Sequence, residues 1–328
     1  MELALLVIVV VVALAFDFTN GFHDTANAIA TSVSTRALSP RLAVLVAAVA
    51  NLAGAFVTTA VAKNVASGIV DPALATTTVV LAALLGAIAW NLFTWRLGLP
   101  SSSSHALIGG LVGAALAKSG SKGVQWHGLV HKVVIPALVA PPLAFVGGFL
   151  LLIAIFWAFV RITPGVANRG FRLGQLGSGT FVAFPHGAND AQKTMGVIAL
   201  ALFTYGSIDH FYIPDWVKVT AGLAIAAGTY AGGWRIMRTL GQRLYKIEPA
   251  AGFAAQTTAG ATIYLATRLG YPLSTTHVIS GSVLGSGSTK GVSAVRWGIA
   301  GNIVAWVLTL PAAALVSAAF YWPLEAIF

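Results

Sequence analysis

Long apolar stretches separated by short polar segments make up most of the 328-residue chain. A helix needs about 20 apolar residues to cross a bilayer, whereas a spanning β-strand alternates in polarity. These stretches are continuously apolar, so the pattern predicts an all-α polytopic membrane protein with about 10–12 helical segments. The stretches cover residues 3–16, 25–33, 42–62, 79–95, 106–117, 133–160, 173–184, 191–204, 217–233, 250–267, 278–285 and 299–320.

The composition supports a membrane protein and argues against other classes. Hydrophobic residues make up 57% of the chain and charged residues 9%, whereas a soluble domain is about 25% charged. The net charge is +10, but the basic residues lie mostly between apolar stretches, which is typical of cytoplasmic loops rather than of a nucleic-acid site. We therefore expect lipid, and not nucleic acid, as the surrounding partner. The chain has no cysteine, which excludes disulfides and thiolate metal sites.

The chain carries an internal duplication. F-T-N-G-F-H-D at residues 18–24 corresponds to F-P-H-G-A-N-D at 184–190. Further on, R-L-G-L-P-S-S-S-S-H at 96–105 corresponds to R-L-G-Y-P-L-S-T-T-H at 268–277. The two pairs occur in the same order and at nearly the same offset. This predicts a first repeat over residues 1–160, a linker over 161–172 and a second repeat over 173–328.

The charges in corresponding loops indicate that the two repeats are inverted. Residues 36–41 hold two arginines and no acid, whereas 206–216 hold two aspartates and no lysine or arginine. The next pair shows the opposite bias, since residues 63–78 are nearly uncharged and 235–246 hold four basic residues. Basic loops face the cytoplasm, so the repeats are expected to lie oppositely in the inner (plasma) membrane. This predicts a cytoplasmic linker and both termini outside.

Two aspartates stand at matching positions within apolar segments. Asp24 and Asp190 each follow a polar cluster that contains a glycine. Ionisable groups inside a bilayer are costly and usually functional. We expect each helix to break there, so that freed carbonyl groups and the carboxylate bind a cation or a proton. An ordinary helix-capping role is the alternative. For Asp17, which lies alone in its segment, both interpretations stay open.

The neighbours of these aspartates extend the candidate ion site. His23 and Asn189 occupy one repeat position, and imidazole can exchange a proton near neutral pH or act as a neutral hydrogen-bonding group. Lys193 aligns with Asn27 and could pair with Asp190 or face an anion. The predicted residues for cation or proton coupling are Asp24, Asp190, His23, Asn20, Asn27 and Asn189.

Two hydroxyl-rich runs, after Pro100 and Pro272, each precede a short apolar stretch. A proline followed by serines and threonines is typical of a helix start, where N–H groups, hydroxyls and the helix dipole favour an anion. Two such starts meeting near the membrane centre could bind a tetrahedral oxyanion, and simple capping of two helices is the alternative. Whether these segments cross or re-enter the membrane stays open. The predicted anion-binding residues are Ser102, Ser103, Ser104, Ser274, Thr275, Thr276 and Lys193.

Enzyme and metalloprotein classes receive little support. The sequence contains neither a G-x-S-x-G elbow nor a G-x-x-x-x-G-K-[ST] loop, so an intramembrane serine hydrolase is a minor alternative and an ATPase is excluded. His127 and His131 have i, i+4 spacing but no acidic partner nearby, which makes a metal site there weak. We therefore predict no enzyme activity, no resident metal and no cofactor.

The two motif pairs resemble the inorganic phosphate transporter (PiT) family. The resemblance rests on N-G-F-H-D-T-A-N-A at residues 20–28, on G-A-N-D at 187–190 and on the two proline–hydroxyl–histidine runs. It implies two inverted repeats with broken helices and re-entrant hairpins, a homodimer, phosphate between the repeated motifs and a coupling ion at the aspartates. The usual first motif is G-A-N-D-x-A-N-A, and Phe22 and His23 replace Ala and Asn here. That variant is similar to the bacterial low-affinity, proton-coupled branch.

The resemblance predicts a symporter that imports inorganic phosphate with protons. In that branch the cargo is phosphate itself or a neutral complex of phosphate with a divalent metal. Sodium coupling and a sulfate permease of the same fold are the alternatives within the family. An anion channel is the alternative from another class, because a pore can also be lined by helix ends.

Overall fold

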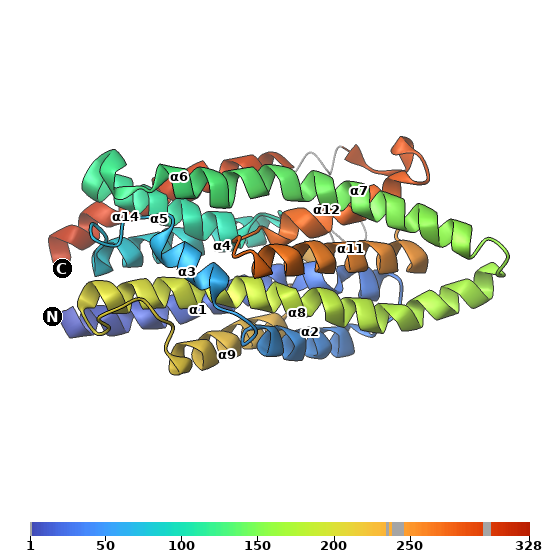
Figure 1. The fold of residues 1–328 in the computed structure, drawn as a ribbon, viewed down its shortest axis with the longest axis horizontal. Helices are drawn as coiled ribbons and strands as arrows, with labels where there is room; N and C mark the ends of the chain where they lie inside the picture. Colours follow the sequence, from blue (N-terminus) through green and yellow to red (C-terminus); the bar gives the residue numbers. More distant parts are fainter. Residues whose placement is uncertain (1, 234–235, 238–245, 298–302) are drawn as a thin grey trace.

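The computed structural model describes residues 2–233, 236–237, 246–297 and 303–328, which form helices joined by turns (Figure 1). Arg235, Arg238 and Arg243 of the predicted basic loop, and residues 299–302 of the last predicted segment, lie outside the described residues. The first-half helices are α1 (Glu2–Ser34), α2 (Pro40–Gly54), α3 (Ala60–Ser67), α4 (Thr77–Leu97), α5 (Ser103–Ser119), α6 (Trp126–Leu129) and α7 (Ile135–Ala158). The second-half helices are α8 (Pro164–Tyr205), α9 (Asp215–Ala231), α11 (Pro249–Arg268), α12 (Thr275–Ser288) and α14 (Ile303–Ile327).

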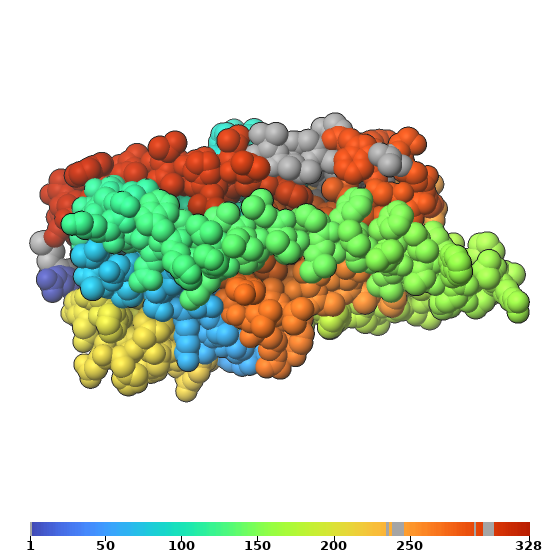
Figure 2. Space-filling model, turned by 45° about the horizontal axis from the view of Figure 1, so that its top comes forward, coloured from blue at the N-terminus to red at the C-terminus, as the bar shows by residue number. Residues whose placement is uncertain are grey.

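Several of these helices are long and apolar enough to cross a bilayer. Within the described residues they are α1, α4, the segment Trp126–Ala158 that includes α7, and Ala305–Ile327 of α14. Figure 2 shows α7 (green) extending along one face of the molecule. Large apolar side chains of α7, such as Leu138 and Trp157, are exposed on its surface, which suits contact with lipid tails. The all-helical membrane fold predicted from the sequence is confirmed.

Two helical hairpins approach each other from opposite ends of the bundle (Figure 1). In the first hairpin, α4 ends at Gly98 and α5 returns antiparallel to it. In the second, α11 leads through Gly270 into α12. Gly98 and Gly270 have φ angles of 68° and 79°, a left-handed conformation that glycine adopts without steric cost. The hydroxyl-rich runs therefore lie at the two hairpin tips.

Each hairpin packs against a helix of the other half of the chain. α5 lies on α14, and α12 lies on α7. The helix backbones touch at glycines, where no side chain would fit. An added Cβ on Gly113 of α5 would lie 2.0 Å from Ala314 O, and one on Gly285 of α12 would lie 1.9 Å from Phe145 O. Small residues four apart allow helices to approach this closely inside a membrane. The two halves are thus interlocked rather than separate bodies.

A polar layer lies between two large apolar clusters. Along α1, residues such as Val9 and Phe16 belong to one cluster and Ala26 and Ala30 to the other. α8 shows the reverse order, with Val182 in the second cluster and residues 195–202 in the first. The polar residues of α1 and α8 fall between these clusters. The apolar packing at both ends therefore fixes the height at which the polar side chains meet.

The expected breaks at the two aspartate motifs are wrong. α1 and α8 run as continuous helices through residues 20–27 and 185–190. The polar side chains find partners on other helices, so the backbone need not open to satisfy them. Thr25, for example, donates its hydroxyl to Gly21 O at 2.7 Å and lies 3.0 Å from Thr229 O of the second half.

The predicted single helix over residues 42–62 is also wrong, because it is divided into α2 and α3. α2 ends at Gly54, where an added Cβ would lie 2.0 Å from Phe184 O of α8. α3 then begins at Ala60, and its free N–H groups at Val61 and Ala62 donate to Gln192 Oε1 at 2.9 and 3.3 Å. A side chain of α8 therefore replaces the helix cap that α3 lacks.

Most of the segment predicted as the linker is helical. α7 ends at Ala158 and α8 begins at Pro164, so residues 164–172 are helical. The turn between these helices and the two chain ends lie at opposite ends of the molecule (Figure 1). The inverted orientation of the repeats, the repeat boundaries and the side on which the termini lie stay predictions.

Candidate substrate and ion site

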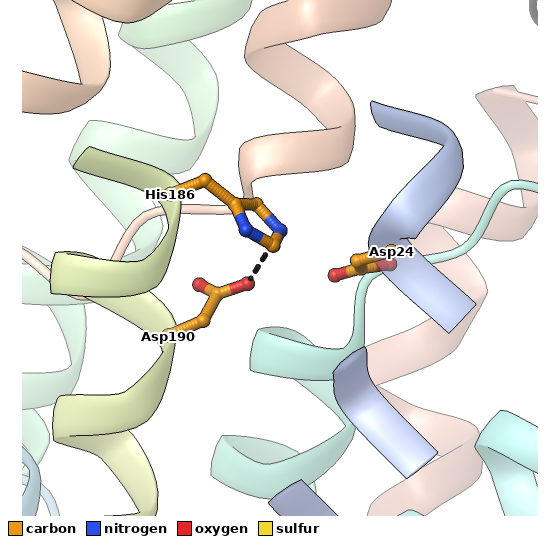
Figure 3. A group of neighbouring side chains, drawn as sticks. All are labelled: Asp24, His186 and Asp190. Carbon is orange, nitrogen blue, oxygen red and sulfur yellow. Dashed lines mark ion pairs between the residues drawn. The ribbon is translucent and has the colours of Figure 1, made fainter. Parts of the chain in front are cut away.

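Carboxylates from the two halves of the chain face each other in the polar layer. Asp24 projects from α1 and Asp190 from α8, together with His186 one turn earlier on α8 (Figure 3). All three side chains are buried. One donor atom from each lies within 4.8 Å of the other two. Such a cluster carries a large electrostatic cost unless cations or protons compensate the two carboxylates.

The hydroxyl-rich helix starts lie beside these carboxylates. Ser103, in the first turn of α5, donates to Asp24 Oδ2 at 2.7 Å or to Asn20 Oδ1 at 2.5 Å. Thr275, its counterpart in α12, lies 3.4 Å from Asp190 Oδ2. The rings of His105 and His277 are 4.9 Å apart, so the two helix starts meet at the centre of the molecule. Their positive dipole ends therefore converge.

Simple capping accounts for part of each hydroxyl run. Ser102 accepts a hydrogen bond from the N–H of His105 at 3.1 Å, and Ser274 accepts from the N–H of His277 at 3.3 Å. These two serines are the N-caps of α5 and α12. Their hydroxyl hydrogens can still donate to a ligand. The capping alternative therefore covers Ser102 and Ser274 without excluding anion binding.

A histidine is paired with the first-half carboxylate. His23 Nδ1 lies 2.7 Å from Asp24 Oδ1, and its Nε2 lies 3.3 Å from Thr94 Oγ1 and 3.4 Å from Ser101 Oγ. Both side chains are fully buried. A hydrogen-bonded imidazole and carboxylate can share and release a proton. The first half thus contains a titratable pair at its aspartate.

The second-half carboxylate has a different partner. Lys193 Nζ donates to Asp190 Oδ1, to Ser104 Oγ at 2.5 Å and to Leu273 O at 2.9 Å. The ammonium group has three hydrogens, and these three acceptors take all of them. Sequence reasoning placed Lys193 among the phosphate ligands. In this conformation its charge lies beside the hydroxyl runs while its donors are occupied.

His186 links the site to the surrounding helices. Its Nδ1 lies 3.1 Å from Asn51 Oδ1, and Asn51 Nδ2 in turn donates to Thr229 Oγ1 at 2.8 Å. The amide oxygen can only accept, so Nδ1 carries a hydrogen. His186 Nε2 points toward Asp190 Oδ2 at 3.3 Å, without hydrogen-bond geometry. It is therefore directed toward the space between the carboxylates.

A sequence model described as "Phosphate transporter family" matches residues 20–317, which include both motif pairs. The chain belongs to the phosphate transporter family. It is an inorganic phosphate transporter of the PiT type, and not an enzyme. The predicted resemblance is thus confirmed.

Several proteins described as "Probable low-affinity inorganic phosphate transporter" are similar to this phosphate transporter. One from Mycobacterium tuberculosis (strain ATCC 25618 / H37Rv) is 55% identical, covering 98% of this chain and 78% of that protein. One from Rhizobium meliloti is 51% identical over 97% of this chain and 96% of that protein. A solved structure titled "The sodium-dependent phosphate transporter" has a TM-score of 0.89 and 25% identity, covering 99% of this chain and 100% of that one.

Asn27 and Asn189, the remaining predicted residues of the transporter, lie around the same centre, but their side chains point in different directions. Asn27 Nδ2 donates to Thr276 Oγ1 at 2.8 Å, and Thr276 lies 3.4 Å from Asp24 Oδ1. Asn189 instead donates to Thr267 Oγ1 at 2.9 Å and to Tyr271 O at 3.0 Å, away from Asp190. The structure thus joins Asn27 to the carboxylate cluster and directs Asn189 toward the second hairpin.

Asp17, for which a functional and a helix-capping role were both open, lies close to the site. Asp17 is fully buried, with Thr194 and Asn20 as polar neighbours. Neither carboxylate oxygen has hydrogen-bond geometry with a described residue. An acid in the middle of an apolar run was the available signal. Asn51 and Gln192 carried no such signal, because their partners come from distant parts of the chain.

Proposed function

We propose that this transporter imports inorganic phosphate together with protons. The observation that supports this most directly is that two hydroxyl-rich helix starts meet beside two buried carboxylates, one from each half of the chain. The starts supply neutral donors for a tetrahedral anion, and the carboxylates supply the coupling. The proposed phosphate ligands are Ser102, Ser103, Ser104, Ser274, Thr275 and Thr276, with Lys193 contributing positive charge beside them.

Electrostatics explains why transport has to be coupled. Two unit charges 4 Å apart interact by about 4 kcal/mol near a protein surface, so phosphate would be repelled by an uncompensated Asp24 or Asp190. Each carboxylate has to hold a positive charge or a proton before the anion enters. Binding of the ion and of phosphate therefore favour each other, as symport requires. The proposed coupling residues are Asp24, Asp190, His23, Asn20, Asn27 and Asn189.

The partner of Asp24 favours a proton over sodium. His23 Nδ1 lies 2.7 Å from the carboxylate, where an imidazole nitrogen is a poor ligand for a hard cation but exchanges protons readily. Sodium is the alternative, because the similar solved structure is titled a sodium-dependent transporter. Uptake of labelled phosphate into proteoliposomes distinguishes the two. We expect an imposed inward proton gradient to drive uptake, a protonophore to abolish it, and replacement of sodium by potassium to leave it unchanged.

A second form of the cargo is a neutral complex of phosphate with a divalent metal. The three donor atoms of Asp24, His186 and Asp190, all within 4.8 Å of one another, favour a cation that travels with the anion. For this cargo, a chelator should stop uptake and labelled metal should enter with phosphate in equal amounts. Sulfate is tested as a competitor in the same vesicles. Trans-stimulation by internal phosphate separates a carrier from a channel.

The same function places the protein in the inner (plasma) membrane as a multi-pass carrier. The charge pattern of the loops favours a cytoplasmic turn between α7 and α8 and external termini. Labelling of single cysteines introduced at Ser207 and at Arg161 would test this, because the chain has no cysteine of its own. A homodimer is the expected assembly, and its mass in detergent is the direct measurement.

A further inference from the structure

The two repeats use the third residue after each aspartate in the same way. Asn27, three residues after Asp24, reaches across to Thr276 Oγ1 of the opposite half at 2.8 Å. Lys193, three residues after Asp190, reaches across to Ser104 Oγ of the opposite half at 2.5 Å. The two hydroxyl residues stand at the same repeat position, one residue before a histidine. Lys193 therefore occupies in the second half the place that Asn27 occupies in the first.

The surroundings of the Lys193 ammonium resemble the coordination shell of a bound cation. Its ligands are one carboxylate oxygen from Asp190, one hydroxyl oxygen from Ser104 and one carbonyl oxygen from Leu273. These are the oxygen types that bind hard cations such as sodium. The Lys193 side chain is fully buried, which is tolerated only because a carboxylate and two dipoles compensate its charge.

The first half lacks such a permanent charge. Asn27 ends in an amide, and its Oδ1 is buried without a hydrogen bond to any described residue. The base beside Asp24 is the imidazole of His23, whose charge depends on protonation. The carboxylate of the first half can therefore exchange its compensating charge. The carboxylate of the second half holds a covalently attached one, and His186 Nε2, 3.3 Å from Asp190 Oδ2, makes no hydrogen bond to it.

We propose that Lys193 is a resident cation, which takes the place of an exchangeable coupling ion at Asp190. The inference rests on the proposed phosphate symport and refines it. Only the Asp24 side then gains and loses a coupling ion in each transport cycle. Asp190 and Lys193 stay paired, and the charge of Lys193 compensates that of Asp190 beside the phosphate.

The direct test converts the second half into a copy of the first. Lys193→Asn leaves Asp190 without its resident charge, so an external ion has to replace it. The measurement is the number of positive charges moved per phosphate, taken from the membrane potential that stops net flux in proteoliposomes. We expect the variant to move one more charge per phosphate than the parent protein, and its uptake to fall when that additional ion is withheld. Lys218→Asn, which breaks an exposed lysine–aspartate pair of the same i, i+3 spacing, is the matched control and should behave as the parent.

A paired substitution keeps the inference testable if Lys193→Asn folds poorly. Asp190→Asn alone should inactivate transport, because it leaves a buried ammonium unpaired. Asp190→Asn combined with Lys193→Asn removes both charges, and we expect it to recover uptake with the parent's charge number. An active Asp190→Asn single variant, or a Lys193→Asn variant with an unchanged charge number and only a raised KM for phosphate, would overturn the inference. A parent protein that moves no phosphate would instead refute the proposed function.

Discussion

The two halves of this transporter hold the same frame and different charges. Each half brings an aspartate on a long helix next to a hydroxyl-rich helix start, and each start packs on a helix of the other half. Two of the sequence differences lie beside the aspartates. The first half has His23 and Asn27 there, and the second has Asn189 and Lys193. The halves thus share a frame, and these substitutions place an imidazole against Asp24 and an ammonium against Asp190.

The different charges of the two halves allow one site to bind phosphate together with a proton or a cation. A fully symmetric site with two uncompensated carboxylates would repel phosphate from both sides. With Lys193 fixed at Asp190, only Asp24 needs a charge from outside before the anion is stable in the site. The asymmetry therefore sets how many ions accompany each phosphate.

Asp24→Asn and Asp190→Asn should each abolish gradient-driven phosphate uptake, but for different reasons. At Asp24 the coupling carboxylate is lost while His23 can remain neutral, so the fold should be kept. At Asp190 the substitution leaves the buried Lys193 ammonium unpaired, which costs about 3–5 kcal/mol of stability. Uptake and thermal unfolding in detergent measure the two effects. Equal unfolding temperatures for both variants would contradict the difference between the halves.

Ser103→Ala and Thr275→Ala should weaken phosphate binding by about tenfold to a hundredfold each. The reason is the loss of a hydrogen bond to a charged group, worth about 1.5–3 kcal/mol. Ser103 also donates to Asp24 or Asn20 in the structure, whereas Thr275 lies only 3.4 Å from Asp190. The serine variant should therefore change the coupling as well. Calorimetry of phosphate binding at two pH values separates affinity from coupling. Unchanged affinity in both variants would remove the hydroxyl runs from the site.

The sequence indicated which polar side chains lie together more accurately than it indicated the path of the backbone. The duplication aligned Asp24 with Asp190 and Asn27 with Lys193, and the structure brings all four side chains into one polar layer. The expected breaks in α1 and α8 failed because Thr25 and similar residues satisfy their hydroxyls on neighbouring helices. Local sequence shows that a group is polar, but not whether another helix will supply its partner.

The same limit applies to the contacts that join the halves. The sequence places Ser104 before a histidine in a helix start, yet nothing in it indicates that Lys193 of α8 reaches this hydroxyl. The division of residues 42–62 had no local signal either, because it depends on Phe184 and Gln192 of α8. Contacts between distant segments come from packing, and one sequence does not contain that information.

His23→Asn gives the first half the residue that the second half has at this position. The substitution removes the imidazole next to Asp24 and leaves a neutral amide. Uptake should keep part of its rate, but its dependence on pH should change, because the imidazole next to Asp24 is the proposed partner for the coupled proton. Initial rates across a range of pH, with potassium as the only other cation, provide the measurement. Lys218→Asn, at the exposed pair with Asp215, serves as the control. A pH profile equal to that of the parent would assign the proton to another residue.

The smallest effect on uptake and stability is expected at an exposed lysine–aspartate pair that has the same spacing as Asp190 and Lys193. Asp215 and Lys218 have the same i, i+3 spacing and an N–O distance of 2.7 Å, but the Asp215 side chain is 93% exposed. A hydrogen bond from Lys218 lowers the pKa of the Asp215 carboxyl. A lowered pKa in the folded state means that this pair stabilises the protein above the unfolded pKa of about 3.9 and loses that effect as the pH falls. Water screens the pair, so Asp215→Asn should leave both uptake and the unfolding temperature unchanged at pH 7. Asp190→Asn should instead lower the unfolding temperature and abolish transport. The two pairs share their spacing, so the difference comes from the burial of Asp190 and Lys193. An Asp215→Asn variant that unfolds several degrees lower at pH 7 would mean that the contrast comes from the spacing of the charges instead.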